Sequence, residues 1–343
     1  MKNILWSEFL GLIILGACLP LTTIAALPAL YTEGVLDAMP ERIKQWKQVQ
    51  SYAAALVPKQ ETTPAGHTLA EKIGYPPPRL IDHPTARVEK SGEDAVATYC
   101  RIWVQITPEL ETYGLYIVPK GLKEHAPLVI AMHGGGGFPE LAAFYNDSRY
   151  HDMVRGAVER GYTVFAPHHI FYPYHDRDHG TPIPEDVRAI LDEQLRRRGT
   201  TLLAVEIAKI TKALDVVLAR PEVDASRVAM IGLSWGGAYT QYTTALEPRI
   251  RVAVSSCSVQ GELAAPDAKP GYGMHREMTT ADLIRLIAPR PLQMQFGDHD
   301  PHNPIDQVRR SLSGLDVPFE LAIFPGDHEF RGELAWAFLK QHL

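Results

Sequence analysis

Cysteine is scarce in this sequence, with three among 343 residues, and no Cys/His spacing is typical of structural zinc. The sequence also lacks internal repeats and low-complexity blocks. Its only basic run is residues 196–198, which we interpret as a solvated loop, and its net charge is −6. Because no basic stretch offers a surface for phosphates, we expect no nucleic-acid partner. The hydrophobic content of 45% indicates an ordinary globular chain.

The N-terminus has the pattern of an export signal. A basic residue precedes an apolar stretch over residues 9–19, which is typical of a secretory leader. Residues 15–18 are similar to a bacterial lipobox, in which Cys18 would be lipidated, whereas residues 23–25 suit ordinary signal peptidase. An uncleaved membrane anchor is the third alternative. We expect residues 1–26 to be a leader of an exported protein that is periplasmic, secreted or attached to the outer membrane through Cys18.

The remaining chain divides into an N-terminal extension, residues 27–85, and a catalytic domain, residues 86–343. Helical periodicity predicts a helix over residues 31–57. Prolines crowd residues 58–84, and this density excludes a helix or a central strand, so we expect an extended connector. Alternating strand-like segments over residues 86–119 predict antiparallel strands that open a sheet.

From residue 128 onwards, short apolar runs alternate with helical segments. The predicted strands are 128–132, 163–167, 228–231, 251–255, 292–296 and 319–324, and the predicted helices are 148–160, 200–219, one that ends near 246, and 332–340. Such alternation indicates a parallel sheet covered on both faces. We therefore predict an α/β fold with a mostly parallel central sheet, antiparallel N-terminal strands and helices on both faces. Cys100 and Cys257 lie in separate predicted strands and are expected to be buried free thiols.

Residues 232–237 read Gly-Leu-Ser-Trp-Gly-Gly directly after an apolar run. G-x-S-x-G in this setting is the pattern of a nucleophile elbow, in which a buried strand turns sharply into a helix. Ser234 would stand at the tip in a strained backbone conformation. Gly232 and Gly236 would be needed where a side chain would collide with the turn. Ser234 is therefore the candidate nucleophile of an acyl-transferring hydrolase.

A base and an acid are predicted downstream of this serine, in loops that follow strands. His328 follows the last predicted strand and is the candidate base. Asp300 is the favoured acid, since it stands three residues beyond the end of a strand and would accept the imidazole Nδ1–H. Asp298 is the competing acid, with a turn-forming role as its alternative.

The glycine run after the first parallel strand is the candidate oxyanion site. Backbone amides at Gly134 and Gly135, together with the amide of Trp235 after the nucleophile, could hold a tetrahedral oxyanion. A phosphate-binding loop is the rival interpretation. The run lacks both the Lys-Ser/Thr ending and the G-x-G-x-x-G spacing of such loops. We expect His133 to brace this loop.

Residues 168–179 gather histidines, aspartates and tyrosines on one long loop. We interpret His168 and His169 as a polar wall of the substrate cleft, with Tyr172 and Tyr174 placed to stack on an aromatic or sugar ring. A metal site is the weaker alternative, because the ligand spacing is irregular. We therefore predict no metal.

Together these motifs resemble the α/β-hydrolase superfamily over roughly residues 90–343. Residues 220–224 and 247–250 are similar to the dienelactone-hydrolase-like and acetylxylan-esterase-like group. The resemblance implies a serine hydrolase without a cofactor that acts on esters of small or carbohydrate-linked acids. Ser234 replaces the nucleophilic cysteine of dienelactone hydrolase proper, so lactone specificity does not follow.

Hydrolysis of carboxylic esters through an acyl-enzyme is thus the leading hypothesis. A prolyl-oligopeptidase-like peptidase or amidase with the same three residues is the alternative, although 343 residues leave no room for the propeller of those peptidases. An exported binding protein that retains the fold is the third. The substrate expected is a small-molecule or carbohydrate-linked ester.

Overall fold

The computed structural model describes the chain from residue 29 onwards, except for residues 59–65, 123–124, 136, 145–148, 171–186 and 262–277. The predicted leader, with Cys18, lies outside the described residues, as do Tyr172 and Tyr174.

Within the described residues, nine strands form one sheet in the order β1-β2-β3-β5-β4-β6-β7-β8-β9. Their bounds are β1 Ala86–Glu93, β2 Ala97–Gln105, β3 Glu111–Pro119, β4 Ala126–Met132, β5 Thr163–Pro167, β6 Val223–Leu233, β7 Val252–Ser256, β8 Leu292–Gly297 and β9 Glu320–Phe324. The first three strands pair antiparallel, and β3 pairs antiparallel with β5. All pairs from β5 to β9 are parallel. The predicted mixed sheet is therefore confirmed.

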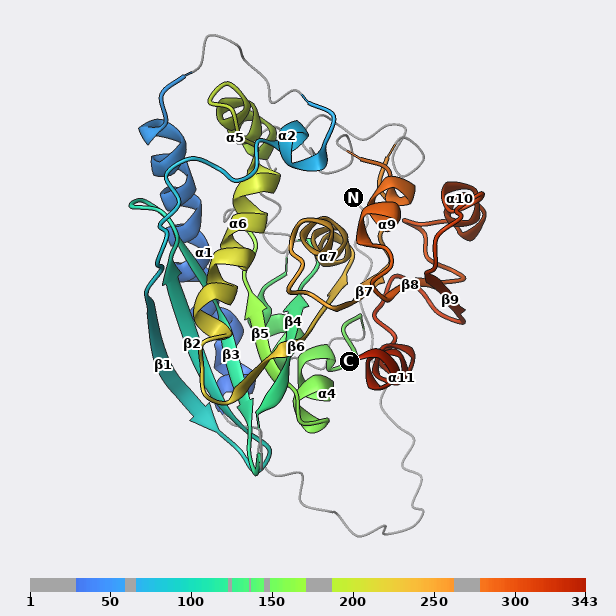
Figure 1. Cartoon of the computed structure of the whole chain (residues 1–343). Coiled ribbons are helices and arrows are strands. Elements are labelled where there is room, and N and C mark those ends of the chain that lie inside the picture. The colour runs from blue at the N-terminus through green and yellow to red at the C-terminus, as the bar shows by residue number, and fades with distance from the viewer. Residues whose placement is uncertain are drawn as a thin grey trace, which may run out of the picture.

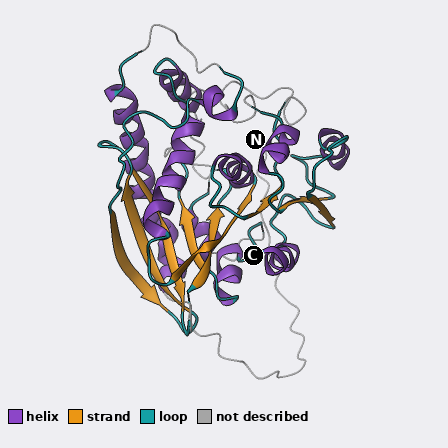
Figure 2. Ribbon diagram, viewed as in Figure 1, coloured by secondary structure: helices purple, strands orange, loops and turns teal. Residues whose placement is uncertain are grey.

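Helices cover both faces of this sheet (Figures 1 and 2). One face packs against α1 Ala29–Ala55, α2 Leu69–Ile73, α5 Val187–Arg196, α6 Leu202–Val217 and α7 Trp235–Leu246. The other packs against α3 Pro139–Phe144, α4 Met153–Glu159 and α11 Gly332–His342. α9 Thr280–Ile287 and α10 Ile305–Ser311 pack around β8. Among the described residues, no helix has both the length and the apolar character needed to cross a bilayer.

The central strands are apolar on both faces because both are covered. In β4, Leu128, Ile130 and Met132 enter the core beneath α6 and α7, while Val129 and Ala131 enter the opposite core beneath α4. Successive side chains of a strand point to opposite faces. This explains why the strand is a continuous apolar run rather than an alternating one.

The proline-rich connector contains a helix, contrary to the prediction for residues 58–84. The hydroxyl of Thr68 accepts the Glu71 N–H at 3.2 Å, and the Glu71 carboxylate accepts the Thr68 N–H at 3.0 Å. These reciprocal bonds form a capping box that starts α2. The prediction was wrong because Pro64 and Pro76 flank this short helix and do not interrupt it.

The basic run at residues 196–198 is only in part a solvated loop. Arg196 is the last residue of α5, and Arg197, which is exposed, and Arg198 lie in the turn that follows. Arg196 and Arg197 pair with Asp192 and Glu193, one helical turn earlier, at 2.8 and 3.0 Å. Such pairs stabilise a helix surface, and this spacing was readable in the sequence.

Candidate active site

Ser234 stands at the junction between β6 and α7. Its backbone has φ 59° and ψ −117°, a strained conformation for a residue other than glycine. Its N–H donates to the carbonyl of Ser256 at the end of β7 (2.9 Å), and its own carbonyl accepts the Ala238 N–H (3.0 Å). The neighbouring strand and the first turn of the helix thus hold the strained residue between them.

The two glycines that flank the serine allow the strand, the helix and the glycine loop to approach one another closely. A Cβ on Gly232 would lie 2.3 Å from the carbonyl oxygen of Gly236. A Cβ on Gly236 would lie 2.3 Å from the carbonyl oxygen of Met132, at the end of β4. Both obstacles are backbone atoms, so a side chain at either position would force the turn apart.

Gly232→Ala is therefore expected to lower the free energy of unfolding by about 1–3 kcal/mol, the usual cost of overpacking. It should also slow hydrolysis of p-nitrophenyl acetate, because the displaced turn carries Ser234. Urea unfolding and hydrolysis of p-nitrophenyl acetate measure the two effects. Gly121→Ala is the control: Gly121 has φ +74°, a Cβ there would meet no atom within 4 Å, and the residue follows β3, far from the elbow. It should lose stability without losing activity, and equal loss of activity in both variants would contradict the prediction.

Asp300 and His328 meet beyond the ends of β8 and β9. The imidazole Nδ1 lies 2.9 Å from Oδ2 and 3.0 Å from Oδ1 of the carboxylate, which is buried. Because a carboxylate only accepts, Nδ1 carries a proton, and in the neutral ring Nε2 then has the lone pair. β6, β8 and β9 run parallel, so Ser234 lies beyond the same edge of the sheet as this pair.

Three further donors hold the Asp300 carboxylate in place. The amide N–H groups of His302 and Asn303 donate to Oδ1 at 2.8 and 3.2 Å, and the Asn303 side chain donates to Oδ2 at 3.0 Å. Burial by itself raises the pKa of Asp300, but these bonds and the one from His328 outweigh it and lower the pKa to about 2. The acid is therefore ionised across the physiological range.

Asp298, the competing acid, is used differently. Its carboxylate accepts the N–H of Gly326 at 3.1 Å and lies 2.7 Å from the imidazole Nδ1 of His299, a ring exposed at the surface. The Gly326 bond ties the end of β8 to the turn that follows β9. In the structure it is Asp300, and not Asp298, that contacts His328.

The lowered pKa of Asp300 predicts how its contribution to stability depends on pH. The folded-state pKa of about 2 lies below the ordinary value of 3.8, so ionised Asp300 stabilises the fold above pH 4. This contribution should decline as the pH falls from 4 towards 2. The difference in unfolding free energy between the wild type and Asp300→Asn, measured in urea at pH 6, 4 and 3, should therefore narrow at pH 3. A difference that is constant over this range would contradict the prediction.

The glycine loop after β4 lies directly against the elbow. A Cβ on Gly134 would lie 3.5 Å from the Cβ of Ser234, and one on Gly135 would lie 3.1 Å from the indole of Trp235. The N–H of Gly134 donates to the hydroxyl of Tyr150 at 2.9 Å. That bond engages one of the three amides predicted for the oxyanion site.

His168 and His169 do not form an open wall of a cleft. Both are buried, and the ring of His169 stacks on that of His133 with centroids 4.1 Å apart. His169 Nε2 lies 3.0 Å from the carbonyl oxygen of Gly134, and His133 Nδ1 lies 2.9 Å from the same atom. The predicted wall of the cleft is thus corrected: His169 packs behind the glycine loop, because β5, which precedes it, runs beside β4.

Cys257 is a buried free thiol just after β7, as predicted, whereas Cys100 in β2 is a free thiol that is only partly buried. The Cys257 sulfur lies within 4.8 Å of the ligand atoms of Asp300 and His328, a grouping that could in principle hold a metal ion. However, its S–H donates to the carbonyl of Glu329, and burial raises the pKa of the thiol. A protonated thiol is a poor metal ligand, so this group fits a packed wall behind the acid–base pair.

Sequence reasoning missed Asn303 and Tyr150. Asn303 was within reach, because Asp300-Pro-His-Asn immediately after a strand is a pattern in which an Asp side chain accepts nearby amides. Its amide also donates to the carbonyl of Cys257 at 3.0 Å, and so joins the β8 loop to the end of β7. Tyr150 carries no local signal, since only the fold brings it to the glycine loop.

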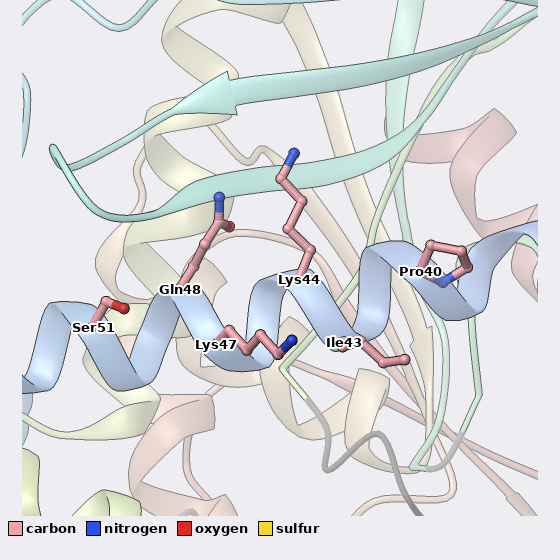
Figure 3. A pocket seen from close by; sticks show the side chains of 6 residues that line it. All are labelled: Pro40, Ile43, Lys44, Lys47, Gln48 and Ser51. Carbon is pink, nitrogen blue, oxygen red and sulfur yellow. The ribbon is translucent and has the colours of Figure 1, made fainter.

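A hollow of about 580 Å³ lies on the surface of α1, away from the loops that carry these groups (Figure 3). Its lining comes from one face of that helix: Pro40, Ile43, Lys44, Lys47, Gln48 and Ser51. None of the predicted site residues lines it, so it is not part of the candidate active site.

A strained serine between a parallel strand and a helix, on a sheet of this order, defines an α/β-hydrolase. More narrowly, the chain belongs to the dienelactone hydrolase family, whose sequence profile matches residues 117–335. It is therefore a hydrolase of that family.

Individual proteins are similar to this chain in sequence or in fold. The chain is 25% identical over 260 residues to YtaP of Bacillus subtilis strain 168. This match covers 70% of this chain and 82% of that protein. Acetyl xylan esterase 1 of Thermoanaerobacterium sp. has the same fold, with a TM-score of 0.54, 18% identity and coverage of 89% of this chain and 93% of that one. The acetyl xylan esterase of Paenibacillus sp. R4 also has this fold, with a TM-score of 0.56, 18% identity and coverage of 87% of this chain and 99% of that one. The glucuronoyl esterase of Solibacter usitatus has it as well, with a TM-score of 0.53, 16% identity and coverage of 86% of this chain and 90% of that one.

Proposed function

We propose that the protein is a serine esterase that hydrolyses carboxylic esters. The observation that carries the proposal is the bond between His328 Nδ1 and the buried Asp300, at the sheet edge where Ser234 is held in a strained turn. This is the constellation required to activate a hydroxyl for attack on an acyl carbon.

In the proposed reaction, Ser234 Oγ attacks the acyl carbon and its proton passes to His328 Nε2. Asp300 holds the imidazole by Nδ1 and stabilises the imidazolium that forms. The amides of Gly135 and Trp235 stabilise the oxyanion, the latter at the N-terminus of α7. Collapse of the tetrahedral intermediate expels the alcohol, which takes the proton from His328. Water then releases the acid from the acyl-enzyme by the same steps in reverse order.

The names of the structural relatives favour carbohydrate-linked esters as the substrate class. Those relatives are acetyl xylan and glucuronoyl esterases. We propose that the chain acts on a short acyl or uronoyl ester of a sugar. A comparison of acetylated and glucuronoyl sugars with simple p-nitrophenyl esters tests this, and a preference for the simple esters over every sugar ester would contradict it.

Labelling with a fluorophosphonate probe tests the serine mechanism. The wild type should form one adduct that maps to Ser234 by peptide mass spectrometry. Rates on p-nitrophenyl acetate, butyrate and octanoate, compared with a peptide p-nitroanilide, then separate an esterase from a peptidase. An unlabelled wild type would rule out the serine mechanism, and faster cleavage of the anilide than of every ester would favour the amidase alternative.

Export remains a proposal based on residues 1–26. Mass spectrometry of the mature N-terminus from the native host distinguishes its forms. A lipidated Cys18 supports an outer-membrane lipoprotein, and an unmodified start near residue 26 supports a secreted or periplasmic protein. An intact N-terminus in the cytosolic fraction would overturn export.

A further inference from the structure

The carbonyl oxygen of Gly134 is an unusually crowded acceptor. His133 Nδ1 and His169 Nε2 reach it at 2.9 and 3.0 Å, and the N–H of Gly137 donates to it at 3.2 Å. All three donors belong to described residues that are buried or lie in the loop itself. The orientation of the Gly134–Gly135 peptide is therefore fixed from the side facing the histidines.

The hydrogen-bond pattern specifies the tautomer of both imidazoles. A carbonyl oxygen only accepts, so His133 must carry its proton on Nδ1 and His169 on Nε2. The remaining nitrogen of His133, Nε2, then has a lone pair, and the backbone N–H of His169 donates to it at 3.4 Å. Burial lowers the pKa of both histidines, to about 3 for His133. Both rings are therefore neutral donors at working pH.

A buried ion pair in α6 holds the chain on either side of His169. Lys209 Nζ donates to the carbonyl of His168 at 2.6 Å and to Glu206 at 3.1 Å. The other carboxylate oxygen of Glu206 accepts the N–H of Ile170. Both charged side chains are almost fully buried, at 1% and 3% exposure. Because desolvation offsets much of the attraction within a buried ion pair, the pair is weak evidence for added stability.

From these contacts we propose that His169, held by the Glu206–Lys209 pair, is a positioning residue. It orients the backbone N–H of Gly135, the proposed oxyanion donor, towards the oxyanion. A trans peptide is planar, so the N–H of Gly135 points opposite to the carbonyl of Gly134. Because the Gly134 carbonyl is held pointing towards the two histidines, the Gly135 N–H is held pointing away from them. The inference rests on the proposed function, since it assumes that an oxyanion forms beside Ser234.

The test replaces the His169 donor while keeping the volume of the side chain. His169→Met removes the N–H, and His169→Gln restores one near the position of Nε2. With p-nitrophenyl acetate, His169→Met should lower kcat by about tenfold or more, a part of the loss caused by deleting an oxyanion donor, with KM nearly unchanged. The Ki of benzeneboronic acid, which forms a tetrahedral adduct, should rise by the same factor as kcat/KM falls. His169→Gln should recover most of both.

The ion pair provides a second, independent variant in case His169→Met does not fold. Glu206→Gln combined with Lys209→Met removes both charges of the pair together. Arg188, 3.9 Å from Glu206, keeps its bonds to the Ile170 carbonyl and the Tyr239 hydroxyl. This double variant should lower kcat and weaken boronate binding by the same factor, and that factor should be smaller than the one for His169→Met. Lys212→Met is the matched control, because Lys212 lies on the same helix and pairs with Asp215 instead. It should leave both quantities unchanged.

The outcomes are distinguishable from a failure of the proposed function. If the wild type is labelled by a fluorophosphonate and folded His169→Met retains full kcat, the positioning role is refuted. A rise in KM alone, with unchanged Ki for the boronate, refutes it as well. If His169→Met is insoluble, unchanged kcat in the double variant has the same meaning. An unlabelled wild type refutes the serine mechanism itself.

Discussion

Ser234→Ala is expected to lower kcat for ester hydrolysis by about 10⁴–10⁶-fold, the range seen when a catalytic serine is removed from a complete triad. The reason is structural as well as chemical. The hydroxyl is carried at the tip of a strained turn between β6 and α7, and alanine keeps the turn while removing the nucleophile. Initial rates on p-nitrophenyl acetate measure the loss, and circular dichroism should show an unchanged fold.

Ser226→Ala is the matched control for this loss. Ser226 lies on the same strand, and its hydroxyl donates only to Asp224 at the exposed end of β6. Its removal should leave kcat within about twofold, as is usual for surface changes. If Ser234→Ala retained more than a hundredth of the wild-type rate, another residue would have to be the nucleophile.

Asp300→Asn is expected to lower kcat by about 10⁴-fold, since an amide in place of the acid favours the wrong imidazole tautomer. An asparagine that offers its N–H to Nδ1 forces the proton onto Nε2, the atom that must accept the proton of Ser234. The carboxylate is buried and held by Asn303, so no water replaces its charge. The measurement is kcat as a function of pH, and the kcat of Asp300→Asn should stay below that of the wild type above neutral pH as well.

Asp298→Asn separates the two candidate acids. Its carboxylate accepts the Gly326 N–H, a bond that the amide oxygen of asparagine can also accept. We therefore expect kcat within about threefold of the wild type, as for an exposed substitution. A larger loss at Asp298 than at Asp300 would reverse the assignment.

The strands and the elbow could be predicted from the sequence because their signals are local. Each buried strand is a short apolar run, and the serine sits in a fixed pattern of glycines. Asp300 and His328 could be predicted because the loops that follow parallel strands lie at one edge of the sheet. Their positions follow from topology, and no sequence spacing between them was needed.

The arrangement behind the glycine loop could not be predicted in the same way. His168 and His169 are adjacent in the sequence, and nothing local distinguishes a ring that faces solvent from one that packs behind the loop. That choice depends on β5 lying beside β4 and on α6 supplying Glu206 and Lys209 beneath. Short helices such as α9 and α10 were missed because seven or eight residues carry little periodicity.

The pairing of β4 with β6 joins residues almost one hundred positions apart, Ala126 with Val223. Closing so long a loop is slow, and contacts of large sequence separation form late in folding. The proposed nucleophile, acid and base lie just after β6, β8 and β9, so all three come later in the chain than β4. A nascent or truncated polypeptide that ends before residue 328 carries a serine without its proton acceptor. Under the proposed mechanism, enzymatic activity therefore reports that the chain extends at least to His328 and that β6, β8 and β9 have come together in the sheet.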